Sequence, residues 1–253
     1  MTTAVAEPGP AIRGTLALAA MELRLTLRRG ENLLVTIVIP AVVLLFFATV
    51  GVLPAAAGRP VDFLLPGSLA LAVIATSMVS LGIATGYERS YGVLKRLAGA
   101  PLPRAGTIAA KILAALVVEV VQAVLLVLLA AGLLDWRPPA GTSLPLLVGA
   151  LLLGSIAFGG LGLLMAGRLR AEATLALANG LFIACLLLGG IIIPVDHLPG
   201  PLQTVAQVLP ASPLADAFRI ALGGAGDPLG PFAALLGWGV VSAGLAARTF
   251  RPE

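Results

Sequence analysis

The sequence predicts an all-α polytopic membrane protein with six transmembrane helices, and three observations support this prediction. Hydrophobic residues make up 59% of the 253 and charged residues only 11%, so polar side chains are too few to cover a water-soluble fold. Long apolar runs recur along the chain. The loops between them are rich in Pro and Gly, which end helices, and none of them resembles a soluble domain or a repeat. We therefore expect one transmembrane domain over residues 1–253.

Six apolar runs have the length of about 20 residues that a membrane-spanning helix requires. They cover residues 32–53, 64–86, 107–134, 144–166, 173–193 and 229–247. The first ten residues contain Glu7, two prolines and no basic group, so a cleaved secretory signal is not expected.

Lys and Arg indicate the orientation of these helices, because basic loops are retained on the cytoplasmic side of a membrane. Of the 16 basic side chains, only Arg59, Arg137 and Arg219 fall in the loops of one side. The loops of the other side hold the rest, including those near both ends of the chain. We therefore expect both termini to be cytoplasmic.

Residues 11–29, ahead of the first predicted span, have the pattern of an amphipathic helix. Apolar side chains recur three or four residues apart, at Ile12, Leu16, Ala19, Leu23 and Leu27. Arg24, Arg28 and Arg29 occupy other positions on the helical wheel. This arrangement favours a helix in the cytoplasmic interface, with its arginines near anionic lipid. An unstructured basic tail is the alternative.

The predicted external segment, residues 194–228, is long and only half polar. Residues 199–208 and 212–222 each have apolar side chains at helical spacing. Ser212 suits the N-cap of the second helix, and Gly223 suits its end. We expect two short helices that enter the outer leaflet as a re-entrant segment, since lipid cannot satisfy the amides of an irregular loop.

The loop between the second and third predicted spans carries the densest charge in the chain. Residues 88–98 are expected to form a short helix at the cytoplasmic surface, with Glu88, Arg89, Lys95 and Arg96 near its ends. A glycine and two prolines then end it. A turn between two spans needs only a few residues, so this segment is expected to be a docking element. A loop that only fixes the membrane orientation is the alternative, although it would not explain Glu88.

This loop and the start of the next span read YERSYGVLKRLAGAPLPRAGTIAAKILAAL over residues 87–116. The stretch resembles the glutamate-bearing cytoplasmic loop of permeases of type-2 ATP-binding-cassette exporters. That family has the pattern E-R-x-x-G-x-L-K-R-L, followed by a proline-bearing loop and a lysine at the next span. The matching residues are Glu88, Arg89, Gly92, Leu94, Lys95, Arg96, Leu97, Pro101, Leu102, Pro103 and Lys111. The resemblance covers essentially the whole chain, because it extends to the six spans, the N-terminal helix and LPASPLADAFRIAL at residues 209–222.

The resemblance implies that residues 88–98 are a coupling helix seated in a cleft of a separate ATPase subunit. Its coupling residues would be Glu88, Arg89, Gly92, Leu94, Lys95, Arg96 and Leu97. Two ATPases would act with two permease protomers, identical or different, in the bacterial plasma (inner) membrane. The implied activity is efflux of drugs or antibiotics, which are amphipathic or lipid-like compounds. Because the chain has no G-x-x-x-x-G-K-[ST] motif, ATP and Mg²⁺ would bind the partner, leaving this chain a permease without a cofactor or catalytic site.

Several polar side chains lie inside the predicted spans, where an ionisable group is costly unless it faces protein or water. Glu119 is the deepest, about 12 Å beyond Lys111 at ~1.5 Å per helical residue. The candidate residues of a translocation path are Thr76, Ser77, Ser80, Glu119, Gln122 and Asn179. The alternative for Glu119 is a buried hydrogen bond that holds two helices together, and hydroxyls can also bond their own helix backbone. In the fourth span, close helix packing is expected at Gly154, Ser155, Gly159, Gly160 and Gly162.

Other functional classes find little support in the side-chain chemistry. Cys185 is the single cysteine and His197 the single histidine, so neither a disulfide framework nor a metal site is expected. The basic residues lie between apolar segments, which argues against binding nucleic acid. A secondary carrier should show inverted repeats and several charged coupling sites, of which only Glu119 is present. Export of polysaccharide or lipid-linked glycan remains an alternative, although residues 194–228 contain one aromatic side chain, Phe218.

Overall fold

A computed structural model of the chain describes residues 10–28, 30–50, 59–93 and 104–249. Within them every regular element is a helix, apart from an isolated β-bridge between Thr142 and Leu222. The helices are α1 (Pro10–Arg28), α2 (Gly30–Val50), α3 (Pro60–Val73), η1 (Ile74–Ser80), α4 (Leu81–Ser90), α6 (Arg104–Leu133), α7 (Leu144–Arg168), α8 (Ala171–Leu188), η2 (Val195–His197), α9 (Gly200–Val208), α10 (Ala211–Ala221) and α11 (Leu229–Thr249).

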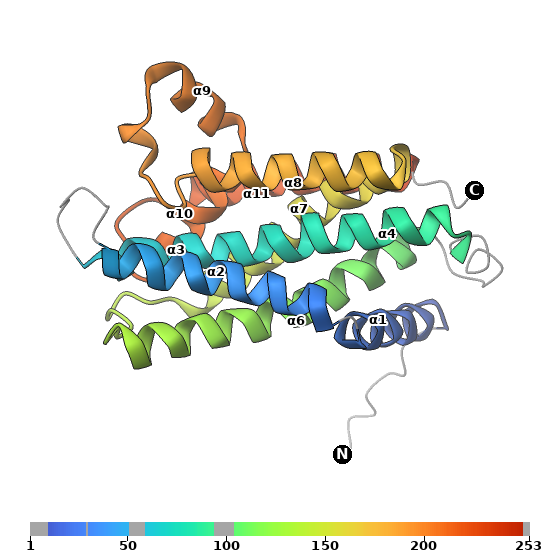
Figure 1. Cartoon of the computed structure of the whole chain (residues 1–253), viewed down its shortest axis with the longest axis horizontal. Helices are drawn as coiled ribbons and strands as arrows, with labels where there is room; N and C mark the ends of the chain where they lie inside the picture. The colour runs from blue at the N-terminus through green and yellow to red at the C-terminus, as the bar shows by residue number, and fades with distance from the viewer. Residues whose placement is uncertain (1–9, 29, 51–58, 94–103, 250–253) are drawn as a thin grey trace, which may run out of the picture.

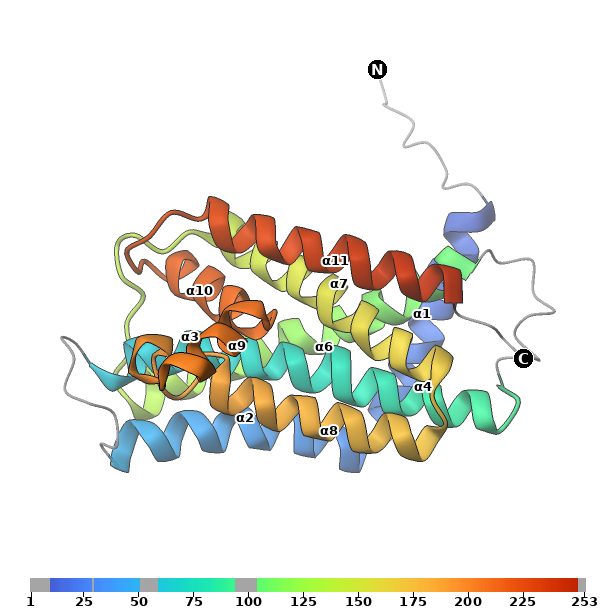
Figure 2. The ribbon, with the colours of Figure 1, turned by 90° about the horizontal axis from the view of Figure 1, so that it is seen from above.

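The long helices run side by side along the long axis of the molecule, whereas α1 lies across one end of the bundle (Figure 1, Figure 2). Five helical segments of the described chain are long and apolar enough to cross a membrane. They are Pro60–Ser90, Ala105–Leu133, Leu144–Arg168, Ala171–Leu188 and Leu229–Arg248. By the same measure α2 contributes a shorter apolar helix, Leu34–Val50. Each of the six predicted runs therefore coincides with a helix, and five of these helices have the length of a span.

The helical segment Pro60–Ser90 is the central element of the bundle and is mostly buried. It consists of α3, η1 and α4 in continuous succession, and it contacts α2, α6, α7, α8 and α10. The middle piece, η1, has π-helical hydrogen bonding over Ile74–Ser80. Such wide turns are rare and occur mostly at functional sites, because they change which side chains face a neighbouring helix. Here the wide turns lie where Thr76 and Ser77 face α6.

Small residues let α7 approach its neighbours closely, as the sequence predicts. A Cβ atom added at Gly162 would lie 2.8 Å from the carbonyl oxygen of Met78 in η1. One added at Gly160 would lie 2.6 Å from the backbone nitrogen of Ala243 in α11. Both obstacles are backbone atoms, which cannot rotate away as a side chain does. These glycines therefore set the spacing of α7 from the central segment and from α11.

We expect Gly160→Ala to destabilise the bundle by about 1–3 kcal/mol, because the added methyl group must push α11 away from α7. The matched control is Gly237→Ala on the neighbouring turns of α11, where an added Cβ meets no atom within 4 Å. Alanine there should leave stability unchanged or raise it slightly, since alanine favours helix. Thermal unfolding of both variants in the same detergent would measure the difference. Equal melting temperatures would contradict the close packing of α7 on α11.

The predicted fifth span ends earlier than expected. Its run extends to residue 193, but α8 stops at Leu188 and Gly189 forms the C-cap. Gly190 then has a φ of 66°, a left-handed conformation that favours glycine and cannot continue a helix. Ile191 and Ile192, which follow, are buried against the bundle without being helical, which is why hydropathy alone extended the span.

Two short helices, α9 and α10, occupy residues 194–228 as the sequence predicts. The predicted N-cap at Ser212 is wrong, however, because α10 begins at Ala211 after Pro210. The carbonyl of Pro210 already accepts the amide of Leu214, so the helix starts one residue before the serine. Gly223 follows α10 with a φ of 92°, consistent with its predicted role at the helix end.

The predicted coupling helix does not begin at Glu88. That residue and Arg89 belong to the last turns of α4, which is the end of the central segment. The helix then stops because Tyr91 and Gly92 form a turn in which Gly92 has a φ of 71°. Residues 94–103, which include the second half of the predicted helix, lie outside the described residues.

Candidate functional site

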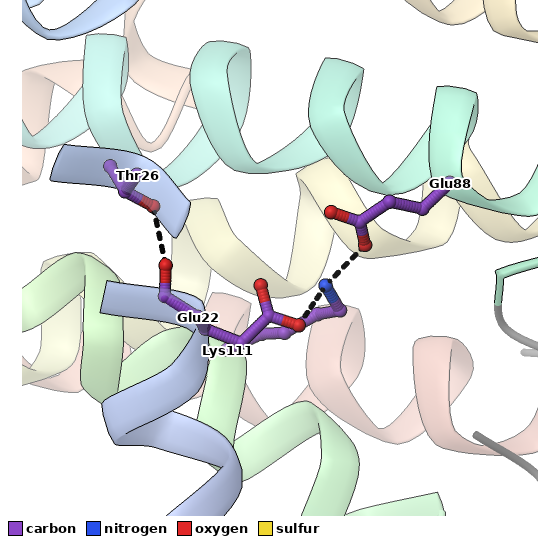
Figure 3. Close-up of polar contacts among 4 residues, drawn as sticks. All are labelled: Glu22, Thr26, Glu88 and Lys111. Atoms are coloured by element: carbon purple, nitrogen blue, oxygen red, sulfur yellow. Dashed lines mark hydrogen bonds and ion pairs between the residues drawn. The ribbon is translucent and has the colours of Figure 1, made fainter. Parts of the chain in front are cut away.

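Three charged side chains meet in the interior at the end of the bundle where α1 lies. Lys111 on α6 donates hydrogen bonds to Glu22 of α1 and to Glu88 of α4, each at 2.7 Å. Only 1% of the surface of Lys111 is exposed, and both carboxylates are buried. Figure 3 shows the ammonium group between the two carboxylates. We call Glu22, Glu88 and Lys111 the ion cluster.

Glu22 enters this cluster from the buried face of α1. It follows Leu18 by four residues and Ala19 by three, so the three side chains share one face of the helix. That face packs on α6, where Leu18 and Ala19 contact Ala110 beside Lys111. The predicted apolar stripe is only partly the packed face, because Ile12, Leu16 and Leu27 are exposed. Sequence reasoning missed Glu22, although a lysine in an apolar run is a signal of a buried partner.

Lys111 is the cation that Glu22 and Glu88 share, so it joins the two carboxylates. A buried ion pair gains little over an apolar contact, but removing one partner leaves an uncompensated charge. A cavity of about 30 Å³ adjoins the cluster and is also lined by Thr76 and Ser80. This is the volume of about one water molecule, and the polar lining offers the hydrogen bonds that such a water requires.

The neighbouring predicted coupling residue, Arg89, joins α4 to a fourth helix. Its guanidinium donates to the carbonyl oxygen of Ala166 at 2.8 Å, near the end of α7. The last turns of α4 are therefore bonded to Lys111 of α6 through Glu88 and to α7 through Arg89, and Lys111 in turn contacts α1. Gly92 lies in the turn that follows. The other predicted coupling residues, Leu94, Lys95, Arg96 and Leu97, lie outside the described residues.

A second polar group lies deeper in the bundle, around Glu119. Ser77 of η1 donates to one carboxylate oxygen of Glu119 at 2.5 Å, and Ser155 of α7 donates to the other. One turn along α6, Gln122 accepts from Thr76 at 2.9 Å and donates to Thr36 of α2 at 3.1 Å. All of these side chains are buried, and Glu119 is 1% exposed. We define the polar layer by its six members: Thr36, Thr76, Ser77, Glu119, Gln122 and Ser155.

The polar layer brings together four of the six residues that the sequence singled out for a translocation path. Ser80 lies nearby, where it lines the small cavity beside the ion cluster. Asn179 is exposed on α8, and the structure does not bring it to the others. Thr36 and Ser155 complete the layer but were not predicted as path residues. A lone hydroxyl in an apolar run gives no signal of such a role, because it commonly bonds its own backbone, as Ser155 also does with Leu151.

Comparison with protein families identifies this architecture. The sequence model of the ABC-2 type transporter family matches residues 13–222, which include the ion cluster, the polar layer and the central segment. The chain belongs to the ABC-2 type transporter family. A comparison with curated proteins finds no match to this ABC-2 chain.

Membership of the ABC-2 family confirms the resemblance at the level of a transporter membrane component. Permeases of this family normally pair with an ABC ATPase, and hydrolysis of ATP is the task of that partner. The five long apolar helices of the described residues agree with a multi-pass membrane protein. The functional question for this ABC-2 permease is therefore what the ion cluster and the polar layer contribute to transport.

Proposed function

We propose that this chain is the permease subunit of an ATP-driven exporter that moves amphipathic or lipid-like compounds, such as drugs or antibiotics, out of a bacterial cell. Separate ATPase subunits bind and hydrolyse ATP, and a second permease protomer completes the transporter. The observation that carries the proposal is the ion cluster. It joins the end of the central segment, which precedes the charged loop, to α6, which follows the loop, and to α1.

In this proposal the chain crosses the membrane six times, and α2 is the first span. Its 21 residues have a length of about 31 Å at ~1.5 Å per residue, which matches the ~30 Å hydrocarbon core. The ends of α4, α7 and α11 and the starts of α6 and α8 gather at the same end of the bundle, together with α1 (Figure 1). Most of the basic residues belong to this end, which supports cytoplasmic termini.

The ion cluster closes the base of the charged loop. Glu88 stands before the loop and Lys111 stands after it, and their 2.7 Å contact holds α4 and α6 together at that point. Glu22 adds α1 to the same contact, and Arg89 adds α7. A force that an ATPase applies to residues 94–97 would therefore reach four helices at once. Rigid transmission of this kind is what coupling between two sites requires.

Movement of the central segment would then change the polar layer. Thr76 and Ser77 belong to that segment, whereas Glu119 and Gln122 belong to α6. A shift of one helix against the other would break these hydrogen bonds and expose the polar groups to a passing compound. The polar layer is in this view the part of the translocation path that meets the polar portion of an amphipathic substrate.

The external segment favours an amphipathic substrate over a glycan. Sugar binding commonly uses exposed aromatic rings, and the single aromatic side chain of residues 194–228 is Phe218. Phe218 is fully buried against the bundle, so it offers no surface for stacking. Export of a polysaccharide or lipid-linked glycan is therefore the weaker alternative.

Reversing the charge of both Lys95 and Arg96 to glutamate should reduce co-purification of the ATPase by tenfold or more. Charge reversal in a packed interface costs a few kcal/mol, and each ~1.4 kcal/mol changes occupancy tenfold. The measurement is the amount of ATPase retained on the tagged permease, together with substrate-stimulated hydrolysis in lipid. The matched control is Arg168→Glu with Arg170→Glu in the loop between α7 and α8, which should retain the ATPase.

If the double variant at residues 95 and 96 retains the ATPase and its stimulation at wild-type levels, the loop only fixes the membrane orientation of the chain. This result would contradict the proposed coupling. Size-exclusion profiles of the purified variants would show whether insertion and folding are retained, so that loss of the ATPase is read only from folded protein.

A further inference from the structure

An apolar groove of about 370 Å³ opens between α6, α7 and α11. Its α6 wall runs from Ala105 to Leu116, its α7 wall lies at Leu152–Ile156, and Ala243 and Ala247 line it on α11. Ser155 is the polar side chain of the lining, and its hydroxyl is already bonded to Glu119 and to Leu151. The groove is therefore apolar, and Ile108, which lines it, also packs in a buried cluster with Leu163 and Ala246.

We propose that this groove holds an acyl chain of a resident anionic phospholipid from the cytoplasmic leaflet. The inference rests on the orientation given under the proposed function, in which α6 begins and α11 ends at the cytoplasmic surface. From Ala105 to Leu116 the groove is about 16 Å long at ~1.5 Å per residue, which is half of the ~30 Å hydrocarbon core. It thus extends from the interface to the midplane, the distance that one acyl chain of one leaflet covers.

The volume of the groove suits a small occupant, because 370 Å³ lies in the range of sites for small ligands. A helix about 10 Å wide and 16 Å long occupies roughly 1,200 Å³, so most of it would lie outside the groove. An apolar groove of one leaflet's length fits a single hydrocarbon chain.

Arginine at the mouth of the groove selects the headgroup. Arg248 is exposed and follows the lining residue Ala247 directly, in the last turn of α11. Basic side chains at the cytoplasmic surface attract anionic lipid. The groove therefore receives the chain while the positive charge at its mouth favours a phosphate headgroup of net negative charge.

Lipid retention by the full-length protein tests the inference. The protein is reconstituted in vesicles of equal phosphatidylglycerol and phosphatidylcholine, extracted into mild detergent and washed, and its phospholipid is quantified by mass spectrometry. Wild type should retain one phospholipid per chain, mostly phosphatidylglycerol. Ala109→Trp should lower this amount at least fivefold, because the indole fills the groove from an exposed position of α6 that tolerates a large side chain. Leu113→Trp should have the same effect.

Val124→Trp is the matched control, because Val124 is exposed on α6 outside the groove, and it should retain lipid like wild type. Arg248→Gln should still retain a phospholipid but lose the preference for phosphatidylglycerol, whereas Arg170→Gln should keep it. Equal retention by Ala109→Trp and wild type, or no retention by wild type, would overturn the acyl-chain site. An unchanged preference in Arg248→Gln would overturn the headgroup assignment. None of these readouts requires an ATPase, so failure of the proposed export function leaves the result interpretable.

Discussion

Replacing Lys111 by methionine should remove most of the folded protein. Methionine preserves much of the side-chain volume but removes the ammonium group that the buried carboxylates of Glu22 and Glu88 both contact at 2.7 Å. Removing one partner of a buried ion pair costs about 3–5 kcal/mol, which is a large share of the stability of an ordinary domain. The yield of monodisperse protein in size-exclusion chromatography and the melting temperature of the remainder would measure the loss.

Neutralising the two acids in the same chain should restore folding. The variant with Lys111→Met, Glu22→Gln and Glu88→Gln has no buried charge in the cluster, and its polar amides can bond one another. It should be purified in nearly wild-type yield but should transmit ATP hydrolysis poorly, since the ionic contact between α4, α6 and α1 is gone. Normal folding of Lys111→Met alone would show that the cluster does not stabilise the bundle.

The sequence predicts the spans well because span length and apolar composition are local properties. The run at 229–247 and the helix at Leu229–Thr249 differ by two residues at most. Errors arise where backbone conformation, rather than hydropathy, ends a helix. Gly190 follows the end of α8, and Gly92 follows the end of α4. Both glycines adopt positive φ angles, which a helix cannot continue through. Nothing in the composition of residues 74–80 indicates π-helical geometry, since the segment contains neither Gly nor Pro.

The candidate site was predictable only in part, because its contacts join residues that are distant in the chain. Glu88 stood out as the acid of the charged loop, Lys111 as the lysine of the family pattern, and Glu119 as a charge inside an apolar span. Their partners did not, because Glu22 is separated from Lys111 by 89 positions and Ser155 from Glu119 by 36. A single sequence says that a buried charge needs a partner but not which residue supplies it. Only the packing of α1 and α7 on α6 decides that.

Glu119 is the residue at which a transport role and a structural role can be separated. Its carboxylate accepts hydrogen bonds from Ser77 and Ser155, so it links the central segment to α6 and α7. A glutamine can accept from one serine and donate to the other, because a hydroxyl can act both ways. It preserves the link between the helices and removes the group that can ionise. A leucine removes both, at a cost of about 1–3 kcal/mol for the unpaired buried groups.

We expect Glu119→Gln to fold with a melting temperature close to wild type and to lower the rate of export more than tenfold. The physical reason is that a charged acceptor binds a polar or cationic group about twice as strongly as a neutral amide, so the amide offers a passing substrate a weaker site. Glu119→Leu should lower both export and stability. Substrate efflux from proteoliposomes that contain the ATPase would give the rates, and Gln122→Leu, one turn away, would show whether loss of any polar contact has the same effect. Wild-type export by Glu119→Gln would assign Glu119 to helix packing and would remove the polar layer from the translocation path.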